Sequence, residues 1–240
     1  MQTTTPLYNQ IIAGQHSFQT RVDINNVSYY GNTLISVEAN YTVFSSNQPS
    51  VGGCIASELE VTMIAPSVNI PRMAKVRPYV RVTNGTQTSE WIPQGVFFID
   101  TRETTHDDNG LDILSFHCFD SMLKTEDDYP STSTSFPKSD INVVKEIAKT
   151  IGLQSSSSAT TGIDSRTLTL MNKAYQIGLP VGYSMREVLS YIAAMYAGNW
   201  IMNYDGQLRL VTLTELPDET YYLIDENNEA ITFGGDRILV

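Results

Sequence analysis

The sequence has very little cysteine: Cys54 and Cys118 are the only two in 240 residues. A disulfide framework, which small secreted domains need, is therefore not the basis of this fold. Each cysteine lies in a strand-like run, so we expect two buried free thiols rather than a bridge. The hydrophobic content of 41% is sufficient for a core of ordinary size.

Long apolar runs are also missing. The longest ones, at residues 96–99 and 191–197, are far shorter than the roughly 18 to 20 residues that cross a bilayer. The first twelve residues lack a basic stretch followed by an apolar block, so a cleaved signal peptide is not expected. We predict that no segment spans a membrane.

Positive charge is scarce, with 15 Lys and Arg against 26 Asp and Glu and a formal net charge of −11. This balance repels a phosphate backbone and removes the counterion release that drives nucleic-acid binding. Sequence-specific binding of nucleic acid is therefore not expected. The same sign suits a surface that DNA must pass without adhering.

Recognisable catalytic and metal-binding motifs are absent from the sequence. It contains no phosphate-binding loop, dinucleotide fingerprint, zinc-protease motif, nucleophile elbow or Cys-x-x-Cys pair. Its three histidines, His16, His106 and His117, fall in separate segments that share no helical face. We predict no catalytic residue, no cofactor and no metal site, and we do not expect an enzyme.

Two clusters could still suggest chemistry. His117 and Cys118 are neighbours in a strand, where their side chains point to opposite faces and cannot form a dyad. An oxygen-rich turn could hold calcium but lacks the bidentate glutamate of an EF-hand loop, so we interpret it as a solvated turn. It comprises Asp107, Asp108, Asn109 and Asp112.

Two alternative functions remain open on residue type alone. Glu126, Asp127 and Asp128 could serve a cell-wall hydrolase, although an acid/base pair needs two carboxylates that face one cleft. A carbohydrate-binding module for attachment to the host cell wall could stack sugar rings on aromatic side chains. Its candidates are Trp91, Trp200 and the tyrosine pairs at 29–30 and 221–222. Tyrosine is also favoured at protein interfaces, so the tyrosine pairs fit both uses.

The first half of the chain shows strand periodicity. After a polar arm at residues 1–20, a hairpin is expected around a turn at 29–32, with 33–42 as its second strand. Asn84 and Gly85 favour a type I′ hairpin between 76–82 and 89–92, and 95–103 pairs with 111–120. Residues 111–119 are apolar on both faces, which predicts that another layer or subunit covers the strand.

The composition changes at residue 129, where a connector rich in serine, threonine and proline precedes the first clear helix. Helices are predicted at 141–151, ended by Gly152, and from a Ser184–Glu187 capping box to a terminator at Gly198. A hairpin at 199–212 follows. The apolar strand that ends at Val240 suggests a truncated chain or a docked end.

These patterns predict an α+β fold that is mainly β. The expected organisation is an N-terminal arm (residues 1–20), a barrel-like or split-barrel β domain (21–128) and a small α+β subdomain with two helices and a hairpin (129–240).

Three blocks in order carry a family resemblance: residues 53–62 (GCIASELEVT), 90–100 (EWIPQGVFFID) and 114–123 (LSFHCFDSML). Together with the helix at 183–196 they resemble tail proteins of phages and prophages of Gram-positive bacteria, over roughly residues 21–212. Within that group the chain is similar to the baseplate or tail-tip hub family. Hub proteins are usually longer, and some related tail proteins continue into a peptidase or carbohydrate-binding part.

The resemblance implies a structural protein of the virion tail, made in the cytoplasm of the bacterial host. It implies self-association into a ring, with a trimer expected, that links the tail tube to a spike or fibre. The implied partners are other tail proteins: the tube, the distal tail protein, and the spike or fibre. The resemblance transfers no catalytic motif.

Overall fold

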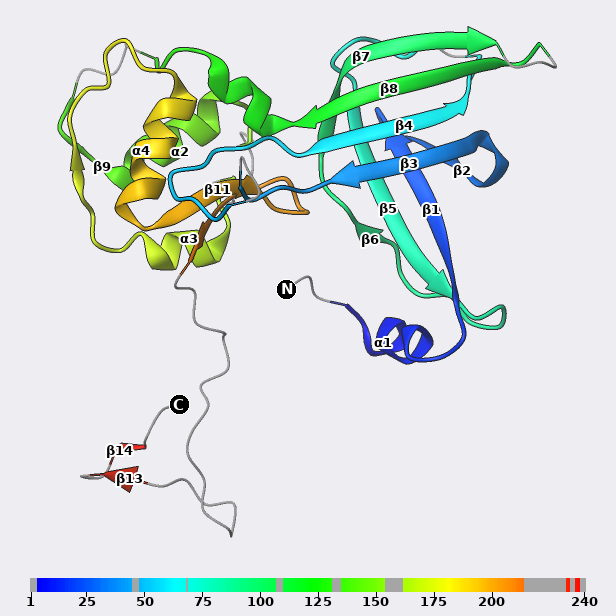
Figure 1. Ribbon diagram of the computed structural model, residues 1–240, viewed down its shortest axis with the longest axis horizontal. Helices are drawn as coiled ribbons and strands as arrows, with labels where there is room; N and C mark the ends of the chain where they lie inside the picture. Colours follow the sequence, from blue (N-terminus) through cyan, green and yellow to red (C-terminus); the bar gives the residue numbers. More distant parts are fainter. Residues whose placement is uncertain are drawn as a thin grey trace.

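A computed structural model describes residues 4–44, 48–67, 69–106, 110–130, 135–153 and 162–213, together with the backbone of 232–233 and 236–237. A large antiparallel sheet lies beside a smaller part that contains helices and a hairpin (Figure 1). The predicted fold class, α+β and mainly β, is confirmed. No helix in the described residues has the length and apolarity to span a membrane.

The large sheet has the strand order β2-β1-β5-β7-β8-β4-β3, with β6 added beside β5. The two end strands, β2 and β3, do not pair with each other, so the described strands form an open sheet and not the closed form of the predicted barrel. Its elements are α1 (Pro6–Ile12), β1 (Ser17–Ile24), β2 (Val27–Tyr30), η1 (Gly31–Thr33), β3 (Leu34–Asn40), β4 (Glu58–Ile64), β5 (Lys75–Thr83), β6 (Ile92–Pro93), β7 (Phe97–His106) and β8 (Asp112–Asp120).

The sheet turns a corner between β5 and β7, which share only the residue pairs Lys75–Phe98 and Val76–Phe97. On one side of the corner lie β1, β2, β5 and β6, and on the other side lie β3, β4, β7 and β8. Alternate residues of both halves point inward and form one core, because successive side chains of a strand face opposite ways. Its fully buried members include Val22, Leu59, Met63, Val76, Phe97, Ile99 and Cys118.

The first predicted hairpin, with its turn at residues 29–32 and residues 33–42 as its second strand, is wrong both in the position of the turn and in the strands that pair. The turn lies at Asn25 and Asn26, which have φ of 47° and 69°, and it joins β1 to β2. Asparagine tolerates this left-handed conformation, and the sequence interpretation overlooked the pair in favour of the Gly31 region. Strand β3 then pairs with β4 instead of returning along β1.

The hairpin at Asn84 and Gly85 is confirmed, since β6 runs antiparallel to β5. Its turn is not type I′, because of the two central residues only Gly85 has a positive φ, of 88°. The Asn84 side-chain oxygen instead accepts hydrogen bonds from the backbone N–H groups of Thr86 and Gln87, at 3.0 and 2.8 Å. The asparagine thus shapes the turn with its side chain.

The first twenty residues contain more regular structure than their sequence pattern indicated. Helix α1 begins after the N-cap Thr5 and buries Ile11, and β1 already starts at Ser17. The Thr5 backbone N–H and hydroxyl both donate to the Glu90 carboxylate, at 2.8 and 2.6 Å. A helix of seven residues is too short to show the apolar period on which the prediction relied.

The smaller part contains the two predicted helices and one that was missed, α3. Its elements are η2 (Ser121–Glu126), β9 (Lys138–Ser139), α2 (Asp140–Thr150), α3 (Ser165–Leu170), β10 (Gln176–Ile177), α4 (Met185–Met195), β11 (Gly198–Met202) and β12 (Leu208–Thr212). The predicted hairpin is confirmed in its register, which sets Trp200 opposite Leu210 and Met202 opposite Leu208. The short strands β13 (Thr232–Phe233) and β14 (Asp236–Arg237) also pair.

The capping box of α4 is confirmed in both directions between Ser184 and Glu187. The terminator is different from the one expected: Ala197 has φ of 50° and Gly198 already belongs to β11. Gly198 is needed for another reason. A Cβ atom there would lie 2.6 Å from the backbone oxygen of Val211 on the paired strand.

The two parts are joined by more than the chain that connects them. The loop between β3 and β4 crosses to the helical part. There the backbone of Cys54 forms an isolated parallel β-bridge with that of Trp200, and the Cys54 side chain is buried in the core of the helical part. The Gly52 N–H donates to the Gly198 carbonyl at 2.8 Å. Met122 of η2 is also buried in that core. The predicted boundary at residue 129, between a β domain and an α+β subdomain, stays a prediction.

Replacing Gly198 with alanine should lower the free energy of unfolding by about 1 to 3 kcal/mol, because β11 and β12 must separate to admit the methyl group. Urea denaturation measures this change. The matched control is Gly178→Ala, where a Cβ meets nothing within 4 Å and a change within about 0.5 kcal/mol is expected. Equal effects of both substitutions would contradict the contact at Val211.

Candidate assembly surface

The open side of the sheet leaves strand edges without a partner. Strand β3 pairs only with β4, and residues 17–20 of β1 pair only with β5, because β2 reaches no further than Arg21. Both edges therefore present backbone N–H and C=O groups that no described strand uses. We call this gap between β1 and β3 the seam.

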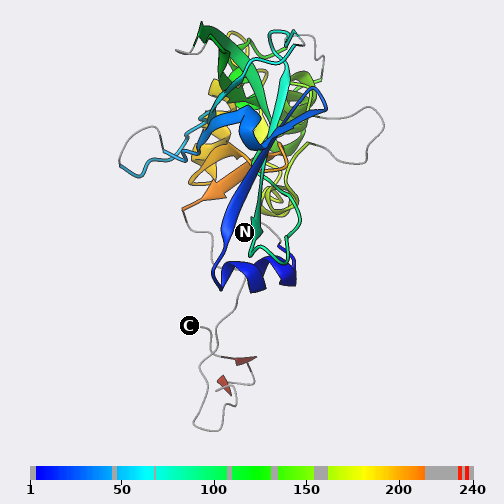
Figure 2. The same cartoon turned by 90° about the vertical axis from the view of Figure 1, so that its right-hand side faces the viewer.

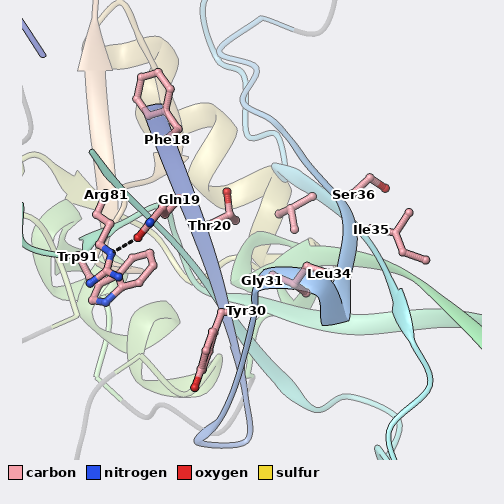
Figure 3. Close-up of a pocket in the computed structure, with 11 residues that line it drawn as sticks. Phe18, Gln19, Thr20, Tyr30, Gly31, Leu34, Ile35, Ser36, Arg81 and Trp91 are labelled. Carbon is pink, nitrogen blue, oxygen red and sulfur yellow. Dashed lines mark hydrogen bonds between the residues drawn. The ribbon is translucent and has the colours of Figure 1, made fainter. Parts of the chain in front are cut away.

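A pocket of about 480 Å³ lies at the seam. Figure 3 shows Gln19, Arg81 and Trp91 on one side of it and the residues of β3 on the other. Three large apolar or aromatic side chains beside it are more than half exposed: Phe18 (59%), Tyr30 (64%) and Ile35 (54%). Such an exposed apolar group is typical of an interaction site.

The outer surface of β1 and β5 carries stacked cations and rings. The Arg21 guanidinium lies 4.3 Å from the ring centroid of Tyr79 and 4.9 Å from that of Trp91, and Arg81 lies 4.2 Å from Trp91. The Arg81 Nε also donates to the Gln19 side chain at 2.8 Å. These contacts hold the guanidinium groups in place at the surface.

The two tryptophans do not form a carbohydrate platform together. Trp200 is fully buried, and its Nε1 donates to the Leu189 carbonyl at 2.9 Å, so its proposed role as a stacking surface is wrong. Trp91 is only partly exposed and already stacks with two arginines. Of the tyrosine pairs, 221–222 lies outside the described residues.

Strand β8 has apolar side chains on both faces, as the sequence indicated. Phe116 and Cys118 point into the core and are buried, whereas Ile113 and Phe119 point outward and are only partly buried. Figure 1 shows β8 between β7 and β4 in the sheet. In the described part of the chain the outer side of β8 therefore keeps apolar area in contact with solvent.

The sequence candidates for nucleophilic or metal chemistry are not brought together. Cys118 is buried while the neighbouring His117 points outward, where its Nε2 lies 3.5 Å from the Glu58 carboxylate. Cys54 and Cys118 are free and buried, as predicted, and burial raises the pKa of each thiol to about 12.

The histidines and the oxygen-rich turn are likewise apart. His106 pairs with Asp112 at 2.6 Å, and the His16 Nδ1 lies 2.8 Å from the Gly14 carbonyl oxygen. Residues 107–109 of the turn lie outside the described residues. Within the residues that are described, no three His, Cys, Asp or Glu side chains are placed to hold a metal ion.

The three consecutive carboxylates face different surroundings. Glu126 forms an ion pair with Arg186 at 2.5 Å. Asp127 contributes its backbone carbonyl to the Met185 N–H at 2.9 Å, and Asp128 forms a backbone bridge with Ser184. They anchor the start of α4, and no described contact places two of them in one cleft.

Asp120, which ends β8 and caps η2, is one of the buried carboxylates that sequence reasoning missed. It is 3% exposed and accepts hydrogen bonds from the backbone N–H groups of Ser57 and Met122, each at 2.8 Å. Burial raises its pKa to about 6, although the hydrogen bonds act in the opposite direction. An aspartate that follows a strand and precedes a short helix was the only available signal.

A second pocket, of about 710 Å³, lies where the chain after β3 meets the turn of the β11–β12 hairpin. Its acidic residue Asp164 is paired with Arg166 at 3.1 Å and accepts from the Asn203 amide at 3.0 Å. Burial alone raises the pKa of Asp164, but these hydrogen bonds outweigh burial and lower it to about 2. The carboxylate is thus engaged within the chain.

No protein-family model matches the chain, and no curated protein matches its sequence. The fold is similar to two solved tail proteins. The 43 kDa tail protein of prophage MuSo2 from Shewanella oneidensis has a TM-score of 0.52 and 14% identity over 87% of this chain. The tail protein from Neisseria meningitidis MC58 has a TM-score of 0.51 and 13% identity over 89% of this chain. This chain spans 59% and 58% of their lengths.

The raised pKa of Asp120 predicts a specific pH dependence. Because its folded pKa of about 6 lies above the ordinary aspartate value of 3.8, the folded state binds the proton more tightly. The stability that results is present below about pH 4 and is lost as the pH rises to about 6. The unfolding free energy of the wild type, relative to Asp120→Asn, should fall by about 3 kcal/mol over this range.

Urea denaturation of both proteins from pH 3 to 7 measures the difference. The control is Asp164→Asn, where the sign is opposite, because a folded pKa of about 2 gives stability that is lost as the pH falls below about 4. A flat difference for Asp120 between pH 4 and 6 would show that the carboxylate is not desolvated as described.

Proposed function

We propose that this chain is a structural subunit of a phage or prophage tail, and more specifically a baseplate or tail-tip hub that assembles into a ring. The observation that carries the proposal is the uncovered outer surface of the sheet. Ile113 and Phe119 of β8 face outward and the seam is open, so a single chain leaves apolar area and strand edges in solvent.

The fold supports this reading. Two solved structures to which the chain is similar, with TM-scores of 0.52 and 0.51, are tail proteins, and the likeness extends over 87% and 89% of this chain. Fold alone does not determine function, so the uncovered surfaces are the second, independent support. The net charge of −11 is a third, since it would let DNA pass a lumen without adhering.

In this proposal the ring links the tail tube to a spike or fibre. The β part, residues 21–128, forms the ring, and the part from 129 onward packs outside it and offers attachment surface. The partners are further copies of the chain, with a trimer expected, and the tube, distal tail and spike or fibre proteins. The subunit is made in the host cytoplasm and ends in the virion tail; a Gram-positive host stays a prediction.

Mass photometry across a concentration series tests the proposal, with negative-stain electron microscopy of the largest species. We expect a discrete oligomer, a trimer, and ring-shaped particles. A chain that is monomeric at every concentration would count against a ring. The hydrolase alternative is checked in parallel by a cell-wall zymogram, where turnover that is lost in Glu126→Gln or Asp128→Asn would replace the structural reading.

A further inference from the structure

Positive charge is gathered on one outer surface of this acidic chain. Along β5 every second residue points outward, and Lys75, Arg77 and Arg81 occupy three of these positions. Arg21 of β1 is paired with Tyr79 in the same ladder and faces the same way. We define the basic face as Arg21, Lys75, Arg77, Tyr79, Arg81 and Trp91.

Most of these cations form no ion pair in the described part of the chain, although Asp23 lies opposite Arg77 on the paired strand. Arg21 pairs with Asp23 at 3.1 Å, but none of the ion pairs among described residues includes Lys75, Arg77 or Arg81. Burial, together with the nearby charges of Arg77 and Lys124, lowers the pKa of Lys75. The basic face therefore repels itself, and an anionic cover would relieve this.

The other half of the sheet has the opposite character. Its outward positions on β3, β4 and β8 form the acidic face, which comprises Glu38, Glu58, Glu60, Ile113, His117 and Phe119. Glu38 and Glu60 lie directly opposite each other on paired strands, an arrangement that destabilises a sheet. Among the described residues, the one ion pair that Glu58 forms is with His117 at 3.5 Å, and neither Glu38 nor Glu60 takes part in one.

The two faces lie on the outer sides of the two half-sheets and adjoin at the corner, where Lys75, Phe98 and Phe119 lie side by side on paired strands. The inward residues of both half-sheets meet in one core, where Val22 and Val76 join Leu59 and Val61. The outward residues of each half therefore point away from that core, and beyond the corner they belong to different outer surfaces. Figure 1 shows β1 and β5 crossing the direction of β3, β4 and β8, and Figure 2 gives the view turned by 90°.

We infer that the basic face of one copy packs on the acidic face of the next copy. This inference rests on the proposed ring and names the contact that builds it. Neither face can pair with itself, because like charges would meet, so a twofold contact through one face is disfavoured. A contact between two different surfaces is heterologous, and such contacts form a closed ring when the rotation between copies closes.

Both faces also carry the apolar area that a stable contact needs. Exposed ion pairs contribute little by themselves, typically below about 1 kcal/mol each. Trp91 and Tyr79 on the basic face, and Ile113 and Phe119 on the acidic face, are partly buried in the single chain and could be covered further. Aromatic and arginine side chains of this kind dominate binding energy at interfaces, while the charges set orientation.

Charge reversal tests the contact by sedimentation velocity on the full chain. Lys75→Glu with Arg77→Glu, and separately Glu38→Lys with Glu60→Lys, should each raise the Kd of self-association at least about tenfold. All four residues are exposed, so folding should be preserved, and circular dichroism checks this. The matched control, Lys145→Glu with Lys149→Glu on the exposed side of α2, changes the net charge as the first variant does and should leave the Kd unchanged.

The decisive experiment combines the two double substitutions in one chain. A chain that carries all four reversals presents complementary faces again, and its Kd should return to within about threefold of the wild type. An equimolar mixture of the two single-face variants should form mixed species that neither variant forms alone. Because only unlike variants can then be neighbours, a closed ring of three cannot form from the mixture.

The outcomes separate this inference from the proposed function. Self-association that both reversals leave unchanged overturns the charged-face contact alone and points to the strand edges at the seam. A loss that the fourfold variant does not restore also overturns it. A wild type that stays monomeric overturns the ring itself. Loss in each single-face variant, with recovery in the fourfold variant and in the mixture, supports the contact.

Discussion

One buried carboxylate at the end of β8 lies at the junction between the sheet and the helical part. Asp120 receives the backbone N–H of Ser57, from the segment that enters β4, and the N–H of Met122, which begins η2. The Asp120 carboxylate therefore ties the sheet to the start of the helical part, in addition to the contacts of the crossing loop at Gly52 and Cys54. Arg186 of α4 donates to the Met122 carbonyl at 3.2 Å and extends the junction. A carboxylate in this position must stay hydrogen-bonded, because its burial is costly.

This junction fixes which surfaces are left for assembly. The helical part and the crossing loop at Cys54 occupy one end of the sheet, where η2 and β11 meet. The outer sides of the two half-sheets and the seam stay uncovered, and they carry the opposite charges and the apolar residues described above. These uncovered surfaces are the part of the molecule on which the proposed role as a tail subunit depends, since the likeness in fold to two tail proteins does not by itself determine function.

Local signals in the sequence were reliable where a few neighbouring residues determine the structure. The Ser184–Glu187 capping box, the Gly152 stop and the Trp200 hairpin register are all present. Prediction failed where pairing over long distances decides, as for β3, which has β4 as its partner. It also failed where an element is short, as for α1 and α3.

The sequence by itself determined the class of fold, the two free buried cysteines and the separation of His117 from Cys118, because alternation along a strand is a local property. Only the tertiary structure decided that the sheet turns its corner at β5 and β7, which places the cations of β5 and the glutamates of β3 and β4 on the outer sides of different half-sheets. No spacing in the chain reveals this, since each charge lies in a different strand and strand order follows from packing of the whole core.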